Sequence, residues 1–369
     1  MALLVYLIYI LAIAGGLYYL LQSSYPENIT IREPQSNPLV SIIIPTRNEE
    51  RNIARCLESL MHQNYSNTEI IVVDGNSTDD TVKIATSYDE VTVVREPDRP
   101  EGWVGKPWAC YFGYQQASGE VFLFTDADTS HRMDSLKATL AELEQSDGFI
   151  SLLTTQEFKS FWEHLLSIVF LIISLSVRGT KGTGNVHIAN GQYMMFTRAT
   201  YEQLGTHQVV ADSIIEDLAF GTLAAKAGNP PKIIAHHNLV RTRMYRSLDE
   251  IQEGFGKNLA LGVREAGIDS LIGGGFISIW AVGWFVLIVI ELLDGTEILL
   301  IEVIIIIIGY LSFAILLYGI ETQVSTGGTF YVLIYPLYFI VLQYIILTSM
   351  IQTYVKNEIV WKDQTYSIK

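Results

Sequence analysis

The sequence predicts a chain of mixed class: an α/β domain with a doubly wound, mostly parallel sheet, joined to α-helical transmembrane segments. Short apolar runs alternate with amphipathic segments from about residue 39 onward, and long, nearly uncharged apolar stretches lie near both ends of the chain. The composition of the 369 residues is intermediate, with 49% hydrophobic and 17% charged residues. A soluble domain of this size is less apolar, and a protein lying wholly in the membrane carries fewer charges.

The N-terminal stretch Leu3–Leu21 is apolar and long enough to cross a bilayer. It lacks a basic n-region and a small-residue cleavage site, so we expect residues 1–22 to be a retained anchor rather than a signal peptide. Residues 23–38 contain Pro26, Pro34 and Pro38 and are expected to form an extended polar linker.

From Leu39 onward, apolar runs of strand length alternate with helical patterns. The expected strands are Val40–Ile44, Glu69–Val73, Val91–Arg95 and Val121–Thr125, and the expected helices are Asn52–His62, Asp79–Ser87, Lys106–Ala117 and Leu136–Glu144. This alternation predicts a parallel, doubly wound sheet with right-handed crossovers. The domain is expected to cover residues 39–265, a plausible size for one domain.

The segment Phe161–Val177 is strongly apolar but short for a membrane span. It fits a buried core helix or a helix at the membrane surface, and we favour the surface because the chain is tethered at both ends. Residues 266–355 then contain three apolar segments, near Leu271–Leu293, Ile298–Ile320 and Phe330–Thr353. Each is long enough to span a bilayer, and residues 356–369 form a tail.

The run Val121–Thr125 ends in two carboxylates one residue apart, Asp126 and Asp128. A strand has period two, so both side chains project to the same side just past its end. In open α/β sheets that edge binds ligands. Two oxygen ligands there suit Mg²⁺ or Mn²⁺ shared with substrate phosphates. The alternative is that these aspartates only form a turn or cap the next helix.

Three further polar clusters occur in order along the chain. Pro45–Glu49 follows the first strand, Asp74–Asp80 follows the second, and Ile214–Asp217 opens a later helix. Each cluster alone is weak evidence for a binding site, because turns and helix starts favour the same residue types. Four such clusters in order are much harder to explain as caps.

With these clusters the sequence resembles the family-2 glycosyltransferases, which have the GT-A fold, over about residues 39–260. The resemblance implies that Thr46 and Glu49, with the adjacent Pro45, line the nucleotide pocket and that Asp74 contacts the base. It also implies that Asp126 and Asp128 hold a divalent cation and the donor diphosphate, and that Asp217 is the general base. One departure is Gly75, where the family often has a second Asp, and it leaves the base and ribose contacts open.

The segment Gly102–Ala109 places Lys106 just before a helix, a common position for binding phosphate. An ordinary helix start with Pro107 at its first position fits equally well. The flanking tryptophans resemble the membrane-bound branch that glycosylates carotenoid or hopanoid-type lipids, as does Arg241–Arg246. Within the latter, Arg243 can clamp a diphosphate or meet anionic lipid headgroups.

Asn190 and Gln192 resemble the family's segment near the sugar and the acceptor, with a simple turn as the alternative. The expected activity is transfer of a sugar, with inversion, from a nucleotide-diphosphate donor to a hydroxyl or carboxyl of a lipid. The inversion follows from the resemblance alone. Glu216 beside Asp217, or burial, can raise the pKa of that carboxyl and make it a better base.

Three alternatives stay open. A polyprenyl-phosphate sugar transferase would use an acceptor that is already a phosphate. A processive polysaccharide synthase is disfavoured, because no Gln-x-x-Arg-Trp motif lies between Asp217 and Leu271. The non-enzyme alternative is a membrane module that binds nucleotide sugar without turnover.

The net charge and the cysteine content limit the possible binding partners and the cellular compartment. The net charge of −15 argues against a nucleic-acid partner, because phosphate binding needs a basic surface. Cys56 and Cys110 are expected to be buried free thiols, which fits a reducing compartment. Nucleotide chemistry favours an integral protein of the cell membrane with its catalytic domain in the cytoplasm. The lysines of the tail, Lys356, Lys362 and Lys369, argue mildly for the opposite orientation.

Overall fold

The computed structural model describes residues 2–22, 26, 28–176, 189–254, 268–294, 299–326, 330–355, 358–361 and 364–367. The chain divides into two compact units, which we describe separately. The sheet unit comprises residues 26–157 and 185–244, and the helical unit comprises residues 1–25, 158–184 and 245–369.

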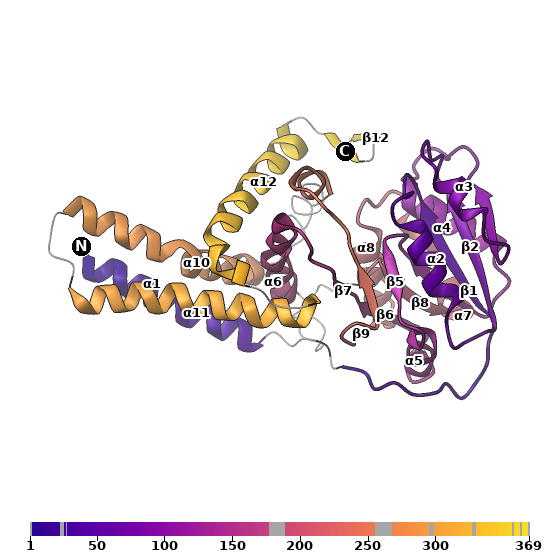
Figure 1. Cartoon of the computed structure of the whole chain (residues 1–369), viewed down its shortest axis with the longest axis horizontal. Helices are drawn as coiled ribbons and strands as arrows, with labels where there is room; N and C mark the ends of the chain where they lie inside the picture. Colours follow the sequence, from indigo (N-terminus) through magenta and orange to yellow (C-terminus); the bar gives the residue numbers. More distant parts are fainter. Residues whose placement is uncertain are drawn as a thin grey trace. The chain divides into compact units, whose positions relative to one another are not determined.

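Within its described residues, the sheet unit is built on a seven-stranded sheet (Figure 1). The strands lie in the order β3 (Val91–Arg95), β2 (Thr68–Asp74), β1 (Val40–Thr46), β4 (Val121–Thr125), β8 (Tyr193–Thr197), β6 (Phe149–Leu153) and β9 (Lys232–Ala235). Only β8 runs antiparallel to its neighbours. The sheet is therefore mostly parallel, as the sequence predicts, and all four expected strands are present.

Helices cover both faces of this sheet. On one face lie α2 (Ile53–Met61), α3 (Thr81–Ala85) and α5 (Ser135–Leu143), and on the other lie α4 (Gly105–Gln116), α7 (Arg198–Gln203) and α8 (Glu216–Lys226). Alternate residues of β1 feed the two cores, with Ile42 and Ile44 on one face and Ile43 on the other. Parallel strands covered on both faces have this continuous apolar character.

The helices form where the sequence gives them one apolar stripe. In α2 the buried residues are Ile53, Cys56, Leu57 and Leu60, the spacing of one helix face. On α4, Gly113 approaches the sheet so closely that a Cβ would lie 2.5 Å from Ile43 Cγ2 and 2.8 Å from Val73 Cγ2. A glycine is therefore needed at this position for α4 to pack against β1 and β2.

A second, three-stranded sheet pairs β5 (Thr129–His131) with β10 (Val240–Thr242) and β10 with β7 (Thr155–Gln156). It begins one residue after Asp128 and brings the segment before Arg243 to the same place. Residues far apart in sequence thus meet next to the end of β4.

The helical unit contains α1 (Ala2–Gln22), η1 (Phe161–Leu165), α6 (Leu166–Ser176), α10 (Ile268–Asp294), α11 (Leu300–Val324), η4 (Phe330–Ile334) and α12 (Tyr335–Val355), with a terminal hairpin of β11 (Glu358–Trp361) and β12 (Gln364–Ser367). Among the residues that the structure describes, three helical stretches are long and apolar enough to cross a membrane: Ile272–Leu293, Leu300–Val324 and Phe330–Ser349. The apolar part of α1, Leu4–Tyr18, is shorter, so the N-terminal span stays a prediction.

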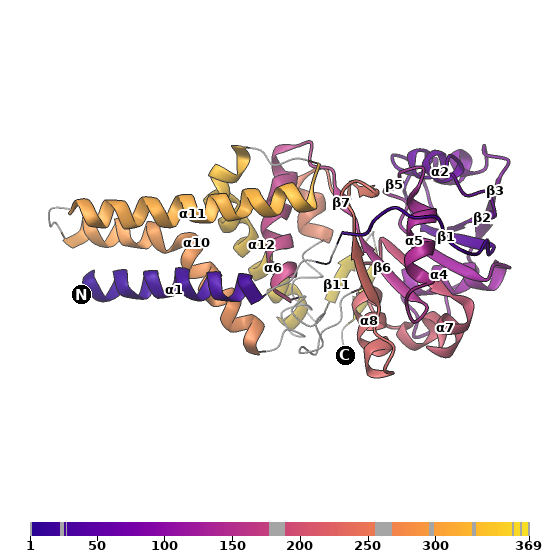
Figure 2. The same cartoon turned by 90° about the horizontal axis from the view of Figure 1, so that it is seen from below.

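Helices α1, α10 and α11 run alongside one another, as both cartoon views show (Figure 2). Small residues allow the close approach: a Cβ on Gly16 would lie 2.8 Å from the ring of Trp280. The Tyr9 hydroxyl donates to the Trp280 carbonyl at 3.1 Å. Small residues at helix contacts are typical of membrane bundles.

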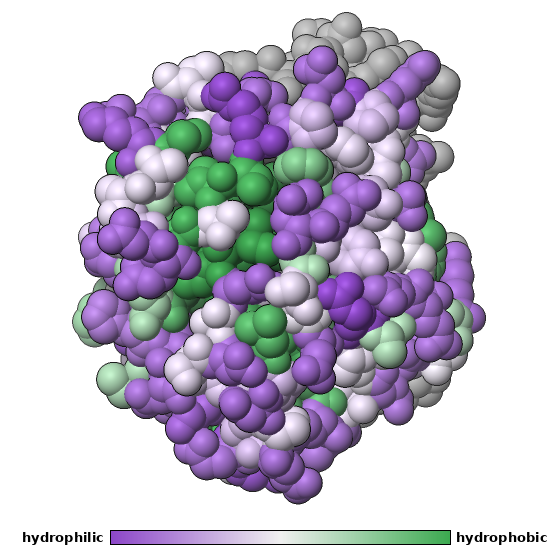
Figure 3. Space-filling view, turned by 90° about the vertical axis from the view of Figure 1, so that its right-hand side faces the viewer, coloured by the Kyte–Doolittle hydropathy of each residue, from purple (hydrophilic) through white to green (hydrophobic). Residues whose placement is uncertain are grey.

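The surfaces of the two units differ in character. On the helical unit, large apolar side chains such as Leu300 and Ile315 are 76% and 70% exposed. The face of the sheet unit drawn in Figure 3 is mainly hydrophilic, with a limited apolar area. Apolar helix faces of this kind are stable in lipid, whereas the hydrophilic face suits water.

Segment Phe161–Val177 forms η1 and α6 up to Ser176 and belongs to the helical unit, while Val177 lies outside the described residues. Here Glu321 of α11, which is 0% exposed, accepts hydrogen bonds from His164 Nδ1 at 2.8 Å and Ser167 Oγ at 3.0 Å. This buried polar contact ties η1 and α6 to α11.

Candidate active site

The candidate site lies at the carboxyl edge of the parallel strands of the sheet unit. Because β8 runs antiparallel to β4, its beginning, rather than its end, lies at this edge. Asn190 and Gln192 therefore reach the site from the start of β8, beside the end of β4. Residues 177–188, which precede this segment, lie outside the described residues.

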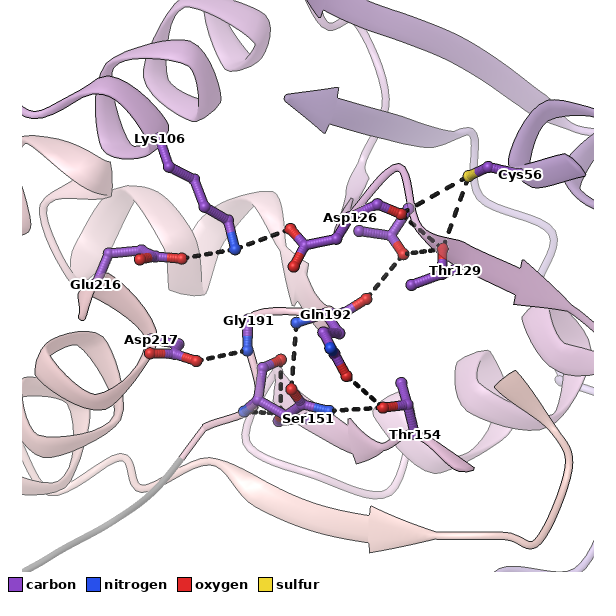
Figure 4. A network of polar contacts seen from close by, with 12 residues as sticks. Cys56, Lys106, Asp126, Thr129, Ser151, Thr154, Gly191, Gln192, Glu216 and Asp217 are labelled. Carbon is purple, nitrogen blue, oxygen red and sulfur yellow. Dashed lines mark hydrogen bonds and ion pairs between the residues drawn. The ribbon is translucent and has the colours of Figure 1, made fainter. Parts of the chain in front are cut away.

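At the centre of the site, Lys106 links two of the polar clusters identified in the sequence (Figure 4). Its Nζ lies 2.8 Å from Asp126 Oδ1 and 2.8 Å from Glu216 Oε1. The side chains of Lys106 and Asp126 are 33% and 27% exposed, whereas that of Glu216 is 6% exposed. An ammonium thus bridges the end of β4 and the start of α8, ninety residues apart in the sequence.

Asp217 faces the same place from the first turn of α8. Its Oδ2 accepts the Gly191 N–H at 2.9 Å, and its Oδ1 accepts the Leu218 N–H at 2.8 Å. A Cβ on Gly191 would lie 3.0 Å from Asp217 Oδ2, 3.0 Å from Lys106 Nζ and 3.1 Å from Glu216 Oε1. Three charged ends therefore gather on the side of Gly191 where a side chain would project.

The electrostatics of this cluster follow from its partial burial. Removal from water and the neighbouring Glu216 raise the pKa of Asp217 to about 6, against the opposing effects of Lys106 and the two backbone N–H donors. Burial alone would lower the Lys106 pKa, but Asp126, Glu216 and Asp217 outweigh it and raise that pKa well above its usual value. The site therefore holds a permanent cation and a carboxylate that titrates near neutrality.

Asn190 and Gln192 are fixed by hydrogen bonds to β6 and the segment after it. The Asn190 side chain donates to the Leu152 carbonyl at 2.9 Å, and the Thr154 hydroxyl donates to Gln192 Oε1. Gln192 is 6% exposed, and its carbonyl accepts from the Thr125 hydroxyl at 2.8 Å. These contacts hold the turn at Gly191 in place.

The residues assigned to the nucleotide lie at the ends of β1 and β2. Thr46 is buried and donates to the Val73 carbonyl at 3.1 Å, so its hydroxyl ties the two strands together. Asp74 is 1% exposed and accepts from the Ser77 N–H at 3.0 Å and Arg95 Nε at 3.3 Å.

Two neighbours complete this end of the site. Pro45, the residue before Thr46, pairs with Val73 in the β1–β2 register and is partly buried. Glu49 accepts from Asn52 Nδ2 at 2.8 Å, and its charge contributes to the environment of Asp126. The four residues predicted to bind the nucleotide therefore lie at or just after two adjacent strand ends, next to the acidic cluster.

Asp128 and Arg243 meet through the small sheet. The Arg243 N–H donates to the Asp128 carbonyl at 3.4 Å, and Arg55 Nη2 donates to the same carbonyl at 3.0 Å. Arg55 also pairs with Glu157 at 2.7 Å. This network fixes the backbone that carries the second aspartate of the predicted metal motif.

The residues present fit a divalent cation that is shared with a substrate. Among the described residues, no group of three His, Cys, Asp and Glu side chains is placed to hold a metal by itself. Mg²⁺ typically takes one or two protein carboxylates and completes its shell with water and substrate phosphates. Asp126 and Asp128, the two aspartates predicted to bind the cation, would supply two such oxygen ligands, and a donor diphosphate would have to supply the rest.

Glu96 was not identified from the sequence. It directly follows β3 as Asp74 ends β2, and its Oε1 lies 3.6 Å from the position of a Cβ on Gly75. Burial, with a contribution from Asp74 and against Arg99 and Arg47, raises its pKa to about 7. The rule that drew attention to Asp74, a carboxylate at a strand end, applied equally to Glu96.

The sequence of the chain is similar to those of known glycosyltransferases. Residues 41–205 match the family model described as glycosyl transferase family 2. The chain is 29% identical over 338 residues to the 4,4'-diaponeurosporenoate glycosyltransferase of Staphylococcus aureus (strain USA300), and the match covers 89% of this chain and 88% of the relative.

Among solved structures, the chain resembles the mannosyltransferase PcManGT from Pyrobaculum calidifontis in complex with GDP-Man and Mn²⁺. The TM-score is 0.56 at 20% identity, and the match covers 93% of this chain and 99% of that chain. At this identity the likeness concerns the fold, and it confirms the fold class expected from the sequence.

Proposed function

Since this chain is a glycosyltransferase with a family-2 domain of the GT-A fold and helices able to span a membrane, we propose that it glycosylates a lipid of carotenoid or related isoprenoid type. The donor is a nucleotide-diphosphate hexose, and the acceptor oxygen belongs to a hydroxyl or a carboxyl group. The relative from Staphylococcus aureus, whose name specifies a carotenoid acid, supports the choice of acceptor.

The observation that carries the proposal is the cluster of Lys106, Asp126, Glu216 and Asp217 around Gly191. Sugar transfer requires a positive charge for the departing diphosphate, and transfer to a hydroxyl also requires a base, whereas a carboxylate acceptor is already deprotonated. Lys106 provides the first and Asp217 the second, and both face one point of the same edge. A protein that only bound nucleotide sugar would need no base there.

The residues act in one displacement step. The acceptor oxygen attacks the anomeric carbon as the bond from that carbon to the diphosphate oxygen breaks, and the electron pair leaves with the diphosphate. Asp217 takes the proton of a hydroxyl acceptor, and its raised pKa makes it a better base than an ordinary aspartate. A single displacement of this kind inverts the anomeric configuration.

Residues at the end of β4 and the start of α4 would stabilise the negative charge of the departing diphosphate. Lys106 would bind the departing phosphate oxygens, and Asp126 and Asp128 would hold Mg²⁺ or Mn²⁺. When bound, the cation supplies Lewis-acid stabilisation of the diphosphate. The ends of β1 and β2, with Pro45, Thr46, Glu49 and Asp74, would bind the nucleoside, while Asn190, Gln192 and Arg243 would face the sugar and diphosphate.

Membrane attachment has a physical reason. Moving a lipid acceptor into water costs about 0.8 kcal/mol per CH₂ group, so a domain held at the interface reaches the polar end without extraction. We propose that residues 39–265 form the catalytic domain on the cytoplasmic side of the cell membrane. Residues 1–22 and the three spans of residues 266–355 would anchor it, joined by the linker 23–38, with the tail 356–369 on the opposite side.

A transfer assay with lipid extraction tests the proposal. Membranes containing the chain are incubated with radiolabelled nucleotide hexoses and a lipid extract, and the labelled lipid is identified by mass spectrometry. We expect a monoglycosylated isoprenoid, and its formation should depend on Asp217 when the acceptor is a hydroxyl. Label recovered in acid-labile lipid phosphate or in long polymer, or donor binding without release of nucleoside diphosphate, would overturn it.

A further inference from the structure

Lys106 is paired with one of the carboxylates that we propose to bind the metal ion. Its Nζ lies 2.8 Å from Asp126 Oδ1, and Asp126 is one of the two carboxylates proposed to bind the divalent cation. An ammonium at hydrogen-bond distance satisfies the charge of that carboxylate and competes with any second cation for it. In the free protein, therefore, Lys106 opposes metal binding.

The lysine can leave this position at little cost if it gains another anion. Its side chain is one-third exposed, and its stem begins in the first turn of α4, where backbone N–H groups also favour an anion. The second carboxylate paired with Lys106 is that of Glu216 on α8, which is not one of the proposed metal ligands. A diphosphate near the start of α4 would offer Lys106 a replacement for Asp126.

We propose that Lys106 couples donor binding to metal binding: its ammonium neutralises Asp126 in the free enzyme and moves to the donor diphosphate when this binds, which releases Asp126 to the divalent cation. This inference rests on the proposed function, in which a nucleotide-diphosphate donor and a metal share the site. The coupling gives a physical reason for the donor and the metal to bind in a fixed order. The donor must arrive before, or together with, the metal, and Lys106 is a positioning residue for both.

The small number of candidate metal ligands among the described residues points to weak binding of the metal alone. Two carboxylates, one of them already paired with a cation, give weak affinity for Mg²⁺ or Mn²⁺ alone. The incoming diphosphate both removes the competing ammonium and contributes oxygen ligands. Metal affinity is therefore expected to depend steeply on bound nucleotide.

The test compares Lys106→Met with the wild-type chain in two separate binding measurements. Binding of Mn²⁺ alone, followed by electron paramagnetic resonance, is expected to tighten by about fivefold, the change expected for loss of one partly exposed ion pair. Binding of UDP or GDP in the presence of EDTA is expected to weaken by at least about tenfold, as for loss of one charge-assisted hydrogen bond.

Opposite changes are the signature of the proposal, because a purely structural lysine would not move the two affinities in opposite directions. Unchanged or weaker Mn²⁺ binding in Lys106→Met would overturn it. Lys106→Gln serves as a second neutral variant, and Lys106→Arg, which keeps the charge, should bind Mn²⁺ within about twofold of wild type. If Lys106→Arg tightens Mn²⁺ binding as much as Lys106→Met, charge competition is wrong.

Lys83→Met is the matched control, since Lys83 also pairs with an aspartate, Asp80, at 3.4 Å but lies on α3. It should change neither affinity. None of these measurements needs an acceptor or a transfer step. Failure of the lipid transfer assay and failure of this coupling can therefore be told apart.

Discussion

At the scale of single residues, the properties of the site depend on the short distances between its charged groups. Lys106, Asp126, Glu216 and Asp217 come from three different strand or helix ends, and Gly191 alone leaves room for them to converge. Each charge changes the protonation of its neighbours. Substitutions here should therefore affect chemistry more strongly than stability.

Asp217→Asn should lower the rate of sugar transfer by about 100-fold or more, because it removes the proposed base. Donor binding should stay within a few fold of wild type, since asparagine keeps an acceptor oxygen for the Gly191 N–H. Initial rates and donor binding measured separately would check this. Near-normal turnover would remove the role assigned to Asp217.

The rate of transfer should depend on pH through the ionisation of Asp217. The Asp217 pKa is raised to about 6, so the carboxyl is protonated below that pH and cannot accept a proton. With a hydroxyl acceptor, the rate should rise as pH increases toward 6 and level off above about 7. The residual rate of Asp217→Asn should lack this rise. A wild-type rate that is flat from pH 5 to 8 would contradict the assignment.

Gly191→Ala should lower transfer by about 100-fold, because its Cβ would displace the charged ends of Asp217, Lys106 and Glu216. Its cost in the free energy of unfolding should be only about 1–3 kcal/mol. Gly113→Ala is the useful contrast: its Cβ would meet Ile43 and Val73 in the core. It should destabilise the fold while the folded fraction keeps its turnover number.

At the scale of elements, the direction of β8 decides how the site is assembled. An antiparallel strand brings its N-terminal residues, rather than its C-terminal ones, to the edge where the parallel strands end. This is why Asn190–Gln192 and Asp126 meet. In the helical unit, Glu321 of α11 accepts hydrogen bonds from η1 and α6 and so holds these three elements together.

Glu321→Ala should destabilise the helical unit by about 3 kcal/mol, since it leaves His164 and Ser167 buried without their shared acceptor. Thermal unfolding in detergent would measure the loss. Thr322→Ala, at the exposed neighbouring position, should have little effect. A double replacement by apolar residues, Glu321→Leu with His164→Phe, should recover part of the stability. Equal melting temperatures for Glu321→Ala and wild type would contradict the structural role of this contact.

At the scale of the whole molecule, cysteine labelling can establish the orientation in the membrane. Cys56 and Cys110 are 0% and 1% exposed, and burial raises the Cys56 pKa to about 12, so the native thiols should stay unlabelled in the folded protein. Asp89→Cys, on the exposed turn before β3, should react with an impermeant maleimide only after cells are opened. Thr296→Cys, between α10 and α11, should react in intact cells.

The unsubstituted chain is the control and should remain unlabelled in both conditions. Labelling of Asp89→Cys in intact cells would place the sheet unit outside and remove the cytoplasmic assignment. Because nucleotide sugars are cytoplasmic in most cells, that result would also weaken the proposed donor.

Local sequence patterns are sufficient to predict most of the helices and strands of this protein. Strand and helix periodicities predicted β1 to β4 and α2 to α5 within one or two residues, since each buries a continuous run or a single stripe. The length and apolarity of the C-terminal helices likewise need no tertiary information. The acidic residues at strand ends were visible because parallel strands place them at a common edge.

Which of these residues meet depends on how distant segments pack in the folded chain. No local pattern indicates that Lys106 lies between Asp126 and Glu216, because the salt bridge from Lys106 to Glu216, 110 residues later in the sequence, depends on the order of strands in the sheet. The reversed direction of β8, the place of Glu96 beside Gly75 and the need for Gly191 have the same origin. They follow from packing between distant segments, which the period of a single strand or helix does not encode.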